Sequence, residues 1–227
     1  MKTVEVLPFA WGYEEGLARQ HALHDTLAAS GQAELAERVG YLMAGEHEHV
    51  YTLGKHGHNE NMLLSSVALQ RMGVKLVQID RGGDITYHGP GQLVGYPILH
   101  LPALGIGARA YVERLLEAVQ RTCELYGVAC APREDAPGLW LGGDGHGALR
   151  KICAVGVHIG QGVSTHGFAL NVNTDLSYFA KINPCGFSDR GVTSLAAELG
   201  HTVDYGAVRR TFLTCFAEVF GVALLEG

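Results

Sequence analysis

Residues 74–99 read VKLVQIDRGGDITYHGPGQLVGYPIL, and this stretch decides the fold class. Three short apolar segments in it are rich in β-branched and aromatic residues and are bounded by Gly, Pro or Asp, which predicts strands. The predicted strands are Val74–Ile79, Ile85–Tyr87 and Leu93–Leu99. Because their connections are too short for a helical crossover, we expect antiparallel pairing in this region.

Working outward, the chain alternates between predicted strands and predicted helices. Further strands are expected at Thr3–Leu7 and at residues 50–53, and a hairpin is expected from residues 152–159 and 163–172, which a Gly-Gln-Gly turn joins. Helices are expected from residue 13, from Ser65 as N-cap, around residues 111–126, and from Asp204 as N-cap. The pattern predicts an α+β fold, a mixed or antiparallel sheet covered by helices, in one domain spanning residues 1–227.

Composition excludes several classes of function. A formal net charge of −6 without a Lys/Arg cluster is atypical of nucleic-acid binding. Five cysteines without regular spacing are typical of free thiols in a reducing compartment. No signal peptide or apolar run long enough to span a bilayer is found, so we expect a cytoplasmic protein without a membrane partner.

Two glycine runs flank a predicted strand in RGGDITYHGPGQ, residues 81–92. Glycines allow a substrate to lie against bare backbone, and peptide N–H groups there can face a carbonyl oxygen. A pair of tight turns with incidental polar residues is the competing interpretation. The stretch lacks the spacing of a phosphate-binding loop.

Cys185 and Lys151 are the candidate catalytic residues. Cys185 lies between Pro184 and Gly186, outside any periodic segment, where a thiol can be held exposed. A buried, inert cysteine in a turn is the alternative. Lys151 leads an apolar strand, where partial burial favours proton exchange with a thiol or amine, although a solvated lysine is the more frequent outcome at a strand end. Cys153 shares a strand face with Lys151 by alternation and is a rival nucleophile.

Twelve histidines raise the question of a metal site. Glu46-His47-Glu48-His49 is the densest group, but no HExxH or Cys pattern of a zinc site occurs. We therefore expect a solvated polar segment, no metal and no cofactor. His166, just before Gly167, is a possible auxiliary proton acceptor or a structural hydrogen-bond donor.

Four segments in order resemble one family. They are RGGDITYHGPGQLVGYPI, KICAVGVHI, STHGFALNVNTDL and INPCGFSDRGVTSL. They resemble the octanoyl-[acyl-carrier-protein]:protein octanoyltransferases, also called lipoyl(octanoyl) transferases. The resemblance implies a fold similar to the catalytic domains of biotin protein ligases and lipoate-protein ligases.

The resemblance also implies an activity and its residues. The implied reaction transfers octanoyl from octanoyl-acyl carrier protein to a lysine of lipoyl domains, in 2-oxo-acid dehydrogenase complexes and the glycine cleavage H protein. Cys185 corresponds to the acyl-thioester cysteine, and Lys151 to the lysine that adjusts its reactivity. The implied substrate-lining residues are Arg81, Gly82, Gly83, Asp84, Ile85, Thr86, Tyr87, His88, Ala154, Val155, Gly156, Gly167, Phe168 and Ala169. Cys153 stands where the family pattern has a small residue, and Lys55 stands where related ligases often carry Arg.

Two other functions are compatible with the same residues. An ATP-dependent lipoate or biotin ligase on this fold would need no turn cysteine. A non-catalytic module that binds acyl carrier protein or lipoyl domains would need neither candidate catalytic residue. Because such partners are typically acidic, we also expect a local basic rim drawn from Lys55, Arg81, Arg109 or Arg150.

Overall fold

The strands form one large sheet and one small sheet. The computed structural model describes residues 1–9, 12–143, 147–183 and 190–226. Within these ranges the large sheet has nine strands. They are β1 (Thr3–Leu7), β2 (Arg38–Gly45), β6 (Gln92–Leu99), β7 (Ala131–Pro132), β8 (Leu139–Leu141), β9 (Arg150–Gly160), β10 (Val163–Asn171), β11 (Gly191–Val192) and β12 (Ala223–Glu226).

The large sheet is mixed. Its order is β12-β1-β2-β6-β10-β9-β8-β7, with β11 beside β9. The β1 strand pairs in parallel with β12 and β2, and β11 pairs in parallel with β9, whereas β2, β6, β10, β9, β8 and β7 pair antiparallel in succession. Every residue of β6 and β10 is buried, as expected for strands covered on both faces.

The small sheet has the order β4-β3-β5, with β3 at Val50–Leu53, β4 at Lys75–Gln78 and β5 at Ile85–His88. The predicted strands exist, but they do not pair with their neighbours in sequence. The β3 strand pairs in parallel with β4 and antiparallel with β5, and β6 belongs to the other sheet. The long connection from β3 to β4 contains α3 (Ser66–Met72) and permits the parallel pair.

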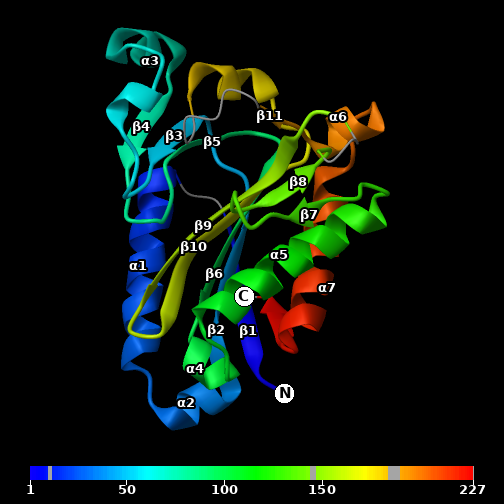
Figure 1. Ribbon diagram of the computed structural model, residues 1–227. Coiled ribbons are helices and arrows are strands. Elements are labelled where there is room, and N and C mark those ends of the chain that lie inside the picture. The colour runs from blue at the N-terminus through cyan, green and yellow to red at the C-terminus, as the bar shows by residue number, and fades with distance from the viewer. Residues whose placement is uncertain (10–11, 144–146, 184–189, 227) are drawn as a thin grey trace.

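Helices cover both faces of the large sheet (Figure 1). The helices α5 (Ala108–Leu125) and α7 (Tyr205–Phe220) lie side by side on one face, and α1 (Tyr13–Ala29) packs against β10, β6 and β2. The short helices are α2 (Gln32–Glu37), α4 (Leu101–Leu104) and α6 (Leu195–Leu199). No helix among the described residues has the length and apolar character needed to cross a membrane.

Several local predictions are confirmed. Ser65 caps α3 by accepting from the Ala68 N–H at 3.2 Å, and Asp204 caps α7 by accepting from the Ala207 N–H at 3.1 Å. Strands β9 and β10 form the predicted hairpin. Gln161 and Gly162 at its turn have φ angles of 50° and 77°, the positive values that a two-residue type I′ turn requires.

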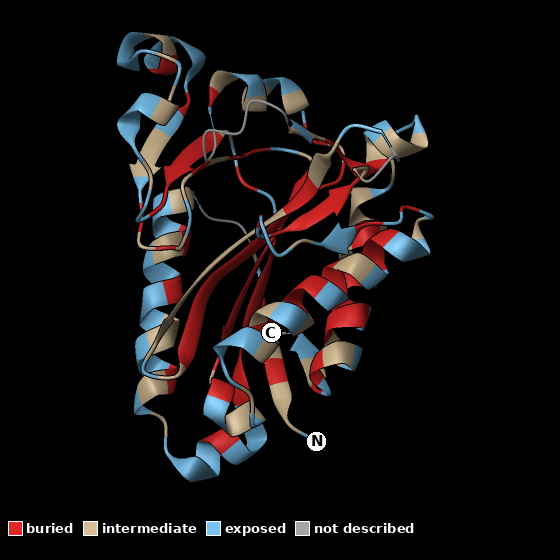
Figure 2. Ribbon diagram, in the orientation of Figure 1, coloured by how far each residue is buried: buried red, intermediate tan, exposed pale blue. Residues whose placement is uncertain are grey.

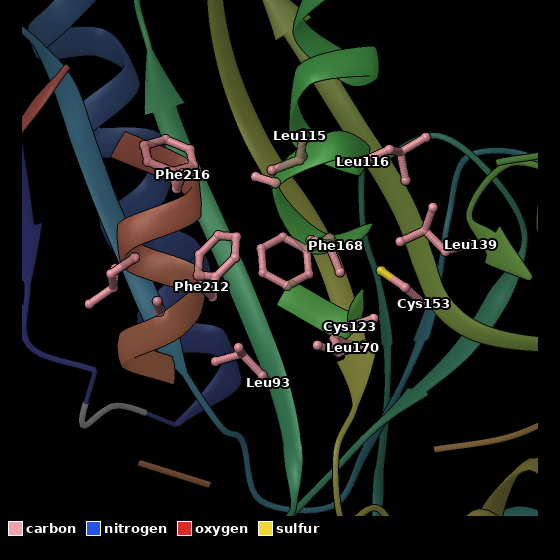
Figure 3. Close-up of a cluster of buried hydrophobic side chains, with 14 of the residues drawn as sticks. Leu93, Leu115, Leu116, Cys123, Leu139, Cys153, Phe168, Leu170, Phe212 and Phe216 are labelled. Carbon is pink, nitrogen blue, oxygen red and sulfur yellow. The ribbon is translucent and has the colours of Figure 1, made fainter. Parts of the chain in front are cut away.

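Two hydrophobic clusters fill the space on either side of the large sheet. Leu93 of β6 belongs to the cluster under α5 and α7, while its neighbour Val94 belongs to the cluster that contains Leu27 of α1. Figure 3 shows the first cluster, in which Phe168 of β10 faces Phe212 of α7. In Figure 2 the central strands are buried along their length, while the outer faces of the helices are exposed. The cores thus fix the strands that carry the site described next.

Candidate functional site

A cavity of about 680 Å³ lies where the two sheets meet. Its walls are the loop and strand Arg81–Thr86, residues 154–157 of β9 and residues 166–169 of β10. All the residues that the sequence assigned to a substrate site line this cavity, with one exception, Tyr87. Lys151 and His166 line it as well. Side chains far apart in the sequence therefore converge on one space, whose volume is in the usual range of about 300–1,000 Å³ for small-molecule sites.

The loop that follows β4 is held in place by its own arginine. Nη2 of Arg81 donates to the Thr52 carbonyl oxygen at 3.0 Å, to Thr52 Oγ1 at 3.0 Å and to the Asp84 carbonyl oxygen at 2.7 Å, and Nη1 donates to the Gly82 carbonyl oxygen at 2.9 Å. Arg81 is only 9% exposed. Its guanidinium therefore binds backbone and fixes the loop conformation.

Glycine is required where this loop meets β9. The Gly82 N–H donates to the Val157 carbonyl oxygen at 3.2 Å, so the loop covers the edge of the strand. A Cβ atom on Gly156 would lie 3.0 Å from the Gly82 carbonyl oxygen. Gly83 has a φ of 87°, which a side chain would strain. The glycines thus allow two backbones to form one wall of the cavity.

Tyr87 and His88 lie on different sides of β5. Tyr87 is fully buried in the core of the small sheet, stacks on Tyr178, and its hydroxyl lies 2.7 Å from Nδ1 of His49. It does not line the cavity, because its ring is packed between Tyr51 and Tyr178 in that core. His88 does line the cavity, and its Nδ1 donates to Oε1 of Gln92 at 2.8 Å. Burial lowers the pKa of His88 to about 3, so its ring is neutral near pH 7.

Lys151 lies at the start of β9, half-buried, with its Nζ 4.6 Å from the centroid of the Trp140 ring. That distance is typical of a cation–π interaction, which holds the ammonium at the cavity wall. Trp140 also lines the cavity, and its indole N–H donates to the Ala136 carbonyl oxygen at 2.9 Å. The lysine side chain is therefore ordered by an aromatic platform rather than solvated at a strand end.

Cys153 does not share the environment of Lys151. The pairing of β8 with β9 shifts register, since Leu139 faces Cys153 while Trp140 faces Lys151, which leaves Ile152 as an extra residue. Ile152 and Cys153 consequently both belong to the core cluster under α5 and α7, where Figure 3 shows the sulfur of Cys153 near Leu139. Burial raises the pKa of the Cys153 thiol. The expectation of a shared face is wrong, because the bulge breaks the alternation.

Cys185, with Pro184 and Gly186, lies outside the described residues. Its flanks are described, and both reach the cavity: Asn183 on one side and Arg190 on the other are lining residues. Val192 of β11 pairs with Lys151 of β9. The other four cysteines, Cys123, Cys130, Cys153 and Cys215, are free and buried, which confirms free thiols in the described part of the chain.

His166 is held by contacts from two other segments. Its Nε2 donates to Oδ1 of Asp80 at 2.7 Å, and its backbone N–H donates to Oε1 of Gln20 at 2.8 Å. Burial lowers the pKa of His166 and outweighs the opposing effect of Asp80. Burial alone would raise the pKa of Asp80, but the hydrogen bond and charge of His166 lower it overall. Near pH 7 the pair is a carboxylate and a neutral imidazole.

Other predictions about charged segments need correction. His47 is buried, with Nε2 2.7 Å from the Tyr96 hydroxyl, and His49 contacts Tyr87, so the two histidines are not solvated as expected. Of the four cations expected at a basic rim, Lys55 is exposed and its backbone N–H donates to the Arg81 carbonyl oxygen, whereas the other three are buried or paired. Arg81 is buried in its loop, Arg150 makes two 2.6 Å contacts with Glu198, and Arg109 pairs with Glu113.

Sequence reasoning missed several lining residues. Tyr13, Gln92, Tyr96, Val112, Trp140, Asn171, Leu176 and Phe179 all contribute to the cavity. Gln92 is the last residue of the glycine-rich stretch 81–92, so its place in the cavity could have been predicted from the sequence. Tyr13 stacks on His88 at 6.1 Å from α1, and Leu176 and Phe179 come from a short 3₁₀ helix at Leu176–Lys181, so only the tertiary fold reveals them.

Comparison with known proteins decides the family. The model of the lipoyl protein ligase A/B catalytic domain matches residues 12–217. An octanoyltransferase of Bacteroides fragilis is 51% identical over 213 residues, covering 92% of this chain and 94% of that protein. The chain belongs to the octanoyltransferase family. A second octanoyltransferase, from Porphyromonas gingivalis, is 48% identical over 211 residues, and the chain spans only 42% of its length.

Solved structures confirm the fold of this octanoyltransferase family member. Lipoate-protein ligase A bound with ATP matches with a TM-score of 0.78 at 17% identity, covering 100% of this chain and 89% of that one. Biotin protein ligase from Aquifex aeolicus matches with a TM-score of 0.50 at 12% identity, covering 96% and 69%. The α+β fold with a mixed sheet, shared with these ligases, is therefore confirmed.

Proposed function

We propose that this protein transfers an octanoyl group from octanoyl-acyl carrier protein to a lysine of lipoyl domains, through a thioester on Cys185. The observation that carries the proposal is the cavity. One space is surrounded by the three segments expected to line an acyl site, by Lys151 and by both flanks of the Cys185 segment. The chain that forms this space belongs to the octanoyltransferase family.

The lining of the cavity supports an acyl substrate. Its apolar residues include Ile85, Val155, Phe168, Leu176 and Phe179, which would surround a hydrocarbon tail. Backbone of the glycine-rich Arg81–Thr86 segment lies at one wall. The Gly82 N–H is bonded to Val157, so other peptide N–H groups of this segment would stabilise a carbonyl oxygen that gains negative charge. No nucleotide is required by the chemistry, because a thioester donor already carries an activated acyl group.

The covalent chain supports a meeting of Cys185 with Lys151. Two peptide units separate Cys185 from Asn183, a span of at most about 7 Å between Cα atoms. Asn183 and Lys151 both line the cavity, and β11 brings the other flank alongside Lys151. A lysine held against Trp140 beside an apolar cavity is placed to exchange a proton with a thiol.

The first half-reaction forms the acyl-enzyme. Lys151 accepts the Cys185 proton in the fraction of molecules in which its amine is unprotonated, and the thiolate attacks the octanoyl carbonyl to give a tetrahedral oxyanion. The carbon–sulfur bond to the carrier then breaks, and the carrier sulfur takes up the proton from Lys151. The products are the Cys185 thioester and the free carrier thiol.

The second half-reaction forms the amide. The lipoyl-domain lysine attacks the thioester carbonyl as a neutral amine, and its proton passes to a base. The carbon–sulfur bond to Cys185 then breaks, and the base returns the proton to the departing sulfur, which leaves Cys185 as the thiol. Lys151 and His166 are the candidate bases. His88 is set aside, since a pKa of about 3 leaves too little basicity to take an amine proton near pH 7. A ping-pong kinetic pattern follows.

The proposal assigns the whole of residues 1–227 to one catalytic domain. The proposed donor is octanoyl-acyl carrier protein, and the proposed acceptors are lipoyl domains of 2-oxo-acid dehydrogenase complexes and the glycine cleavage H protein. The cytoplasmic location, expected from the free cysteines, stays a prediction.

A nucleotide-free transfer assay tests the proposal against its rivals. The protein is mixed with octanoyl-acyl carrier protein and a lipoyl domain, and the mass of the lipoyl domain is followed with and without ATP. We expect octanoylation without ATP, its loss in Cys185→Ser, and its retention in the matched control Cys153→Ala. Strict dependence on ATP would instead indicate a ligase, and unchanged transfer by Cys185→Ser would contradict the thioester route.

A further inference from the structure

Three potential metal ligands from distant segments meet beside the cavity. His21 comes from α1, Asp80 follows β4, and His166 comes from β10. Oδ1 of Asp80 lies 2.7 Å from Nε2 of His166 and 3.6 Å from Nε2 of His21, and the three ligand atoms lie within 4.8 Å of one another. We propose that these residues form a binding site for a divalent transition-metal ion of the zinc type.

The donor set determines the class of metal. Two imidazole nitrogens and one carboxylate oxygen suit Zn²⁺ and its first-row neighbours, whereas Mg²⁺ and Ca²⁺ prefer oxygen ligands alone. Zinc bonds of about 2.0–2.2 Å in a tetrahedron place the ligand atoms about 3.4 Å apart. The observed separations of 2.7 and 3.6 Å lie on either side of that value. Three protein ligands also leave a fourth position for water.

One ligand is fixed and the other two can adjust. The side chain of His166 is 2% exposed, whereas those of Asp80 and His21 are 38% and 49% exposed. The exposed His21 ring can therefore rotate by the small amount that closing the site requires. Access from solvent is open on the same side, so an ion can enter without disturbing the core.

The backbone of His166 is held in an unusual conformation. Its φ of 57° is left-handed, which costs free energy for a residue other than glycine and persists only where contacts enforce it. Phe168 and Leu170 of the same strand belong to the core cluster under α5 and α7, whereas His166 turns to Asp80. The Gln20 side chain binds the His166 N–H, and Gln20 precedes His21 in α1. The contact that holds His166 thus also positions the helical turn that carries His21.

Metal binding would join helix α1 to two parts of the cavity wall. Asp80 leads directly into the Arg81–Thr86 segment, and His166 is itself a lining residue. The ion would replace the hydrogen bond between His166 and Asp80, with the imidazole proton carried on Nδ1. His166 could not accept a proton in that metal-bound form, so Lys151 would then be the base of the second half-reaction. This group was not predictable from the sequence, because positions 21, 80 and 166 are far apart and match no ligand spacing.

Titration of the chelator-stripped protein tests the site. Calorimetry with ZnCl₂, and visible absorption with Co²⁺ in its place, should both report one ion per chain. His21→Ala should weaken binding at least as much as the roughly 10–100-fold that loss of a supporting residue costs. His201→Ala is the matched control, because this exposed histidine contacts the carbonyl oxygen of Thr202 and is not one of the three proposed ligands, so the variant should bind like the parent protein.

Two outcomes would overturn the proposal. If neither Zn²⁺ nor Co²⁺ binds the parent protein at one ion per chain, the site does not exist. Binding of equal strength by the parent protein and His21→Ala would place the metal on other histidines. Because His21 is half-exposed, its replacement leaves the core intact, and neither readout depends on octanoyl transfer.

Discussion

Replacing Arg81 with lysine tests whether this residue holds the cavity loop or only faces the substrate. The guanidinium uses two nitrogens to bind four acceptors: the carbonyl oxygens of Thr52, Gly82 and Asp84, and the Thr52 hydroxyl. A lysine presents one nitrogen and cannot reproduce that fork. Arg81→Lys therefore keeps the positive charge and removes part of the bracing.

The expected cost follows from the bonds lost. Hydrogen bonds to charged groups contribute about 1.5–3 kcal/mol each, so losing one or two should lower the free energy of unfolding by about 1.5–6 kcal/mol. The Asp84 carbonyl oxygen retains the Gly54 N–H as a partner at 3.2 Å, which limits the loss at that atom. Arg71→Lys is the matched control, since Arg71 is exposed on α3 and should change stability by less than about 0.5 kcal/mol.

Two measurements separate global from local effects. Urea unfolding followed by circular dichroism gives the free energy and its slope for both variants. Amide hydrogen exchange follows the N–H groups of Gly54, Lys55 and His56, which donate to carbonyl oxygens of the Arg81 loop. These amides should exchange faster in Arg81→Lys. If Arg81→Lys matches Arg71→Lys in both stability and exchange, the bracing role is refuted.

Three further predictions follow from the burial of the titratable groups. Cys153→Ser places a hydroxyl in an apolar core and should lower the free energy of unfolding in urea by about 1–3 kcal/mol. An unchanged free energy of unfolding would indicate that Cys153 lies in a polar environment. The pKa of His47 is lowered by burial to about 4, so between about pH 6.5 and pH 4 the unfolded chain protonates this ring and the folded protein does not. Stability should therefore fall by about 2 kcal/mol between pH 7 and 5 from His47 alone, in addition to the loss from the buried His88. His47→Phe should reduce the slope of that part of the curve by this amount, whereas a curve parallel to that of the parent protein would contradict the assignment. Lys151→Ala should slow enzyme acylation by about 10²–10⁴-fold in rapid-quench assays, with exposed Lys75→Ala unchanged; an unaltered rate in Lys151→Ala would remove its assigned role.

Local structure was predictable where a turn or cap residue marks it. The β9–β10 hairpin follows from Gly-Gln-Gly, and the starts of α3 and α7 follow from Ser65 and Asp204. The β2 strand was missed. Its sequence, RVGYLMAG, follows α2 directly with no turn residue between them, and its glycines weaken the strand signal.

Strand partners depended on contacts that no local pattern encodes. Short connections between β4, β5 and β6 favour antiparallel neighbours, yet β3 lies between β4 and β5. The β3 strand lies between them because the connection through α3 brings β4 back alongside β3 in parallel. Periodicity locates a strand, but the order in a sheet comes from long-range packing.

The sequence predicted where the candidate site lies better than it predicted what each of its residues does. Cavity-lining segments follow from the glycine runs, but Arg81 binds backbone and Tyr87 packs in the small core. The bulge at Ile152 separates Cys153 from Lys151, and strict alternation cannot anticipate an inserted residue. Asp80 was not selected at all, because its partner His166 is 86 positions away.

The most direct test of the thioester route is the mass of the protein itself after brief exposure to octanoyl-acyl carrier protein alone, with no acceptor and no nucleotide. We predict one octanoyl group per chain, located by peptide mapping at Cys185, sensitive to hydroxylamine and absent from Cys185→Ser. An unmodified protein, or an octanoyl group that maps elsewhere and persists in Cys185→Ser, would contradict the route.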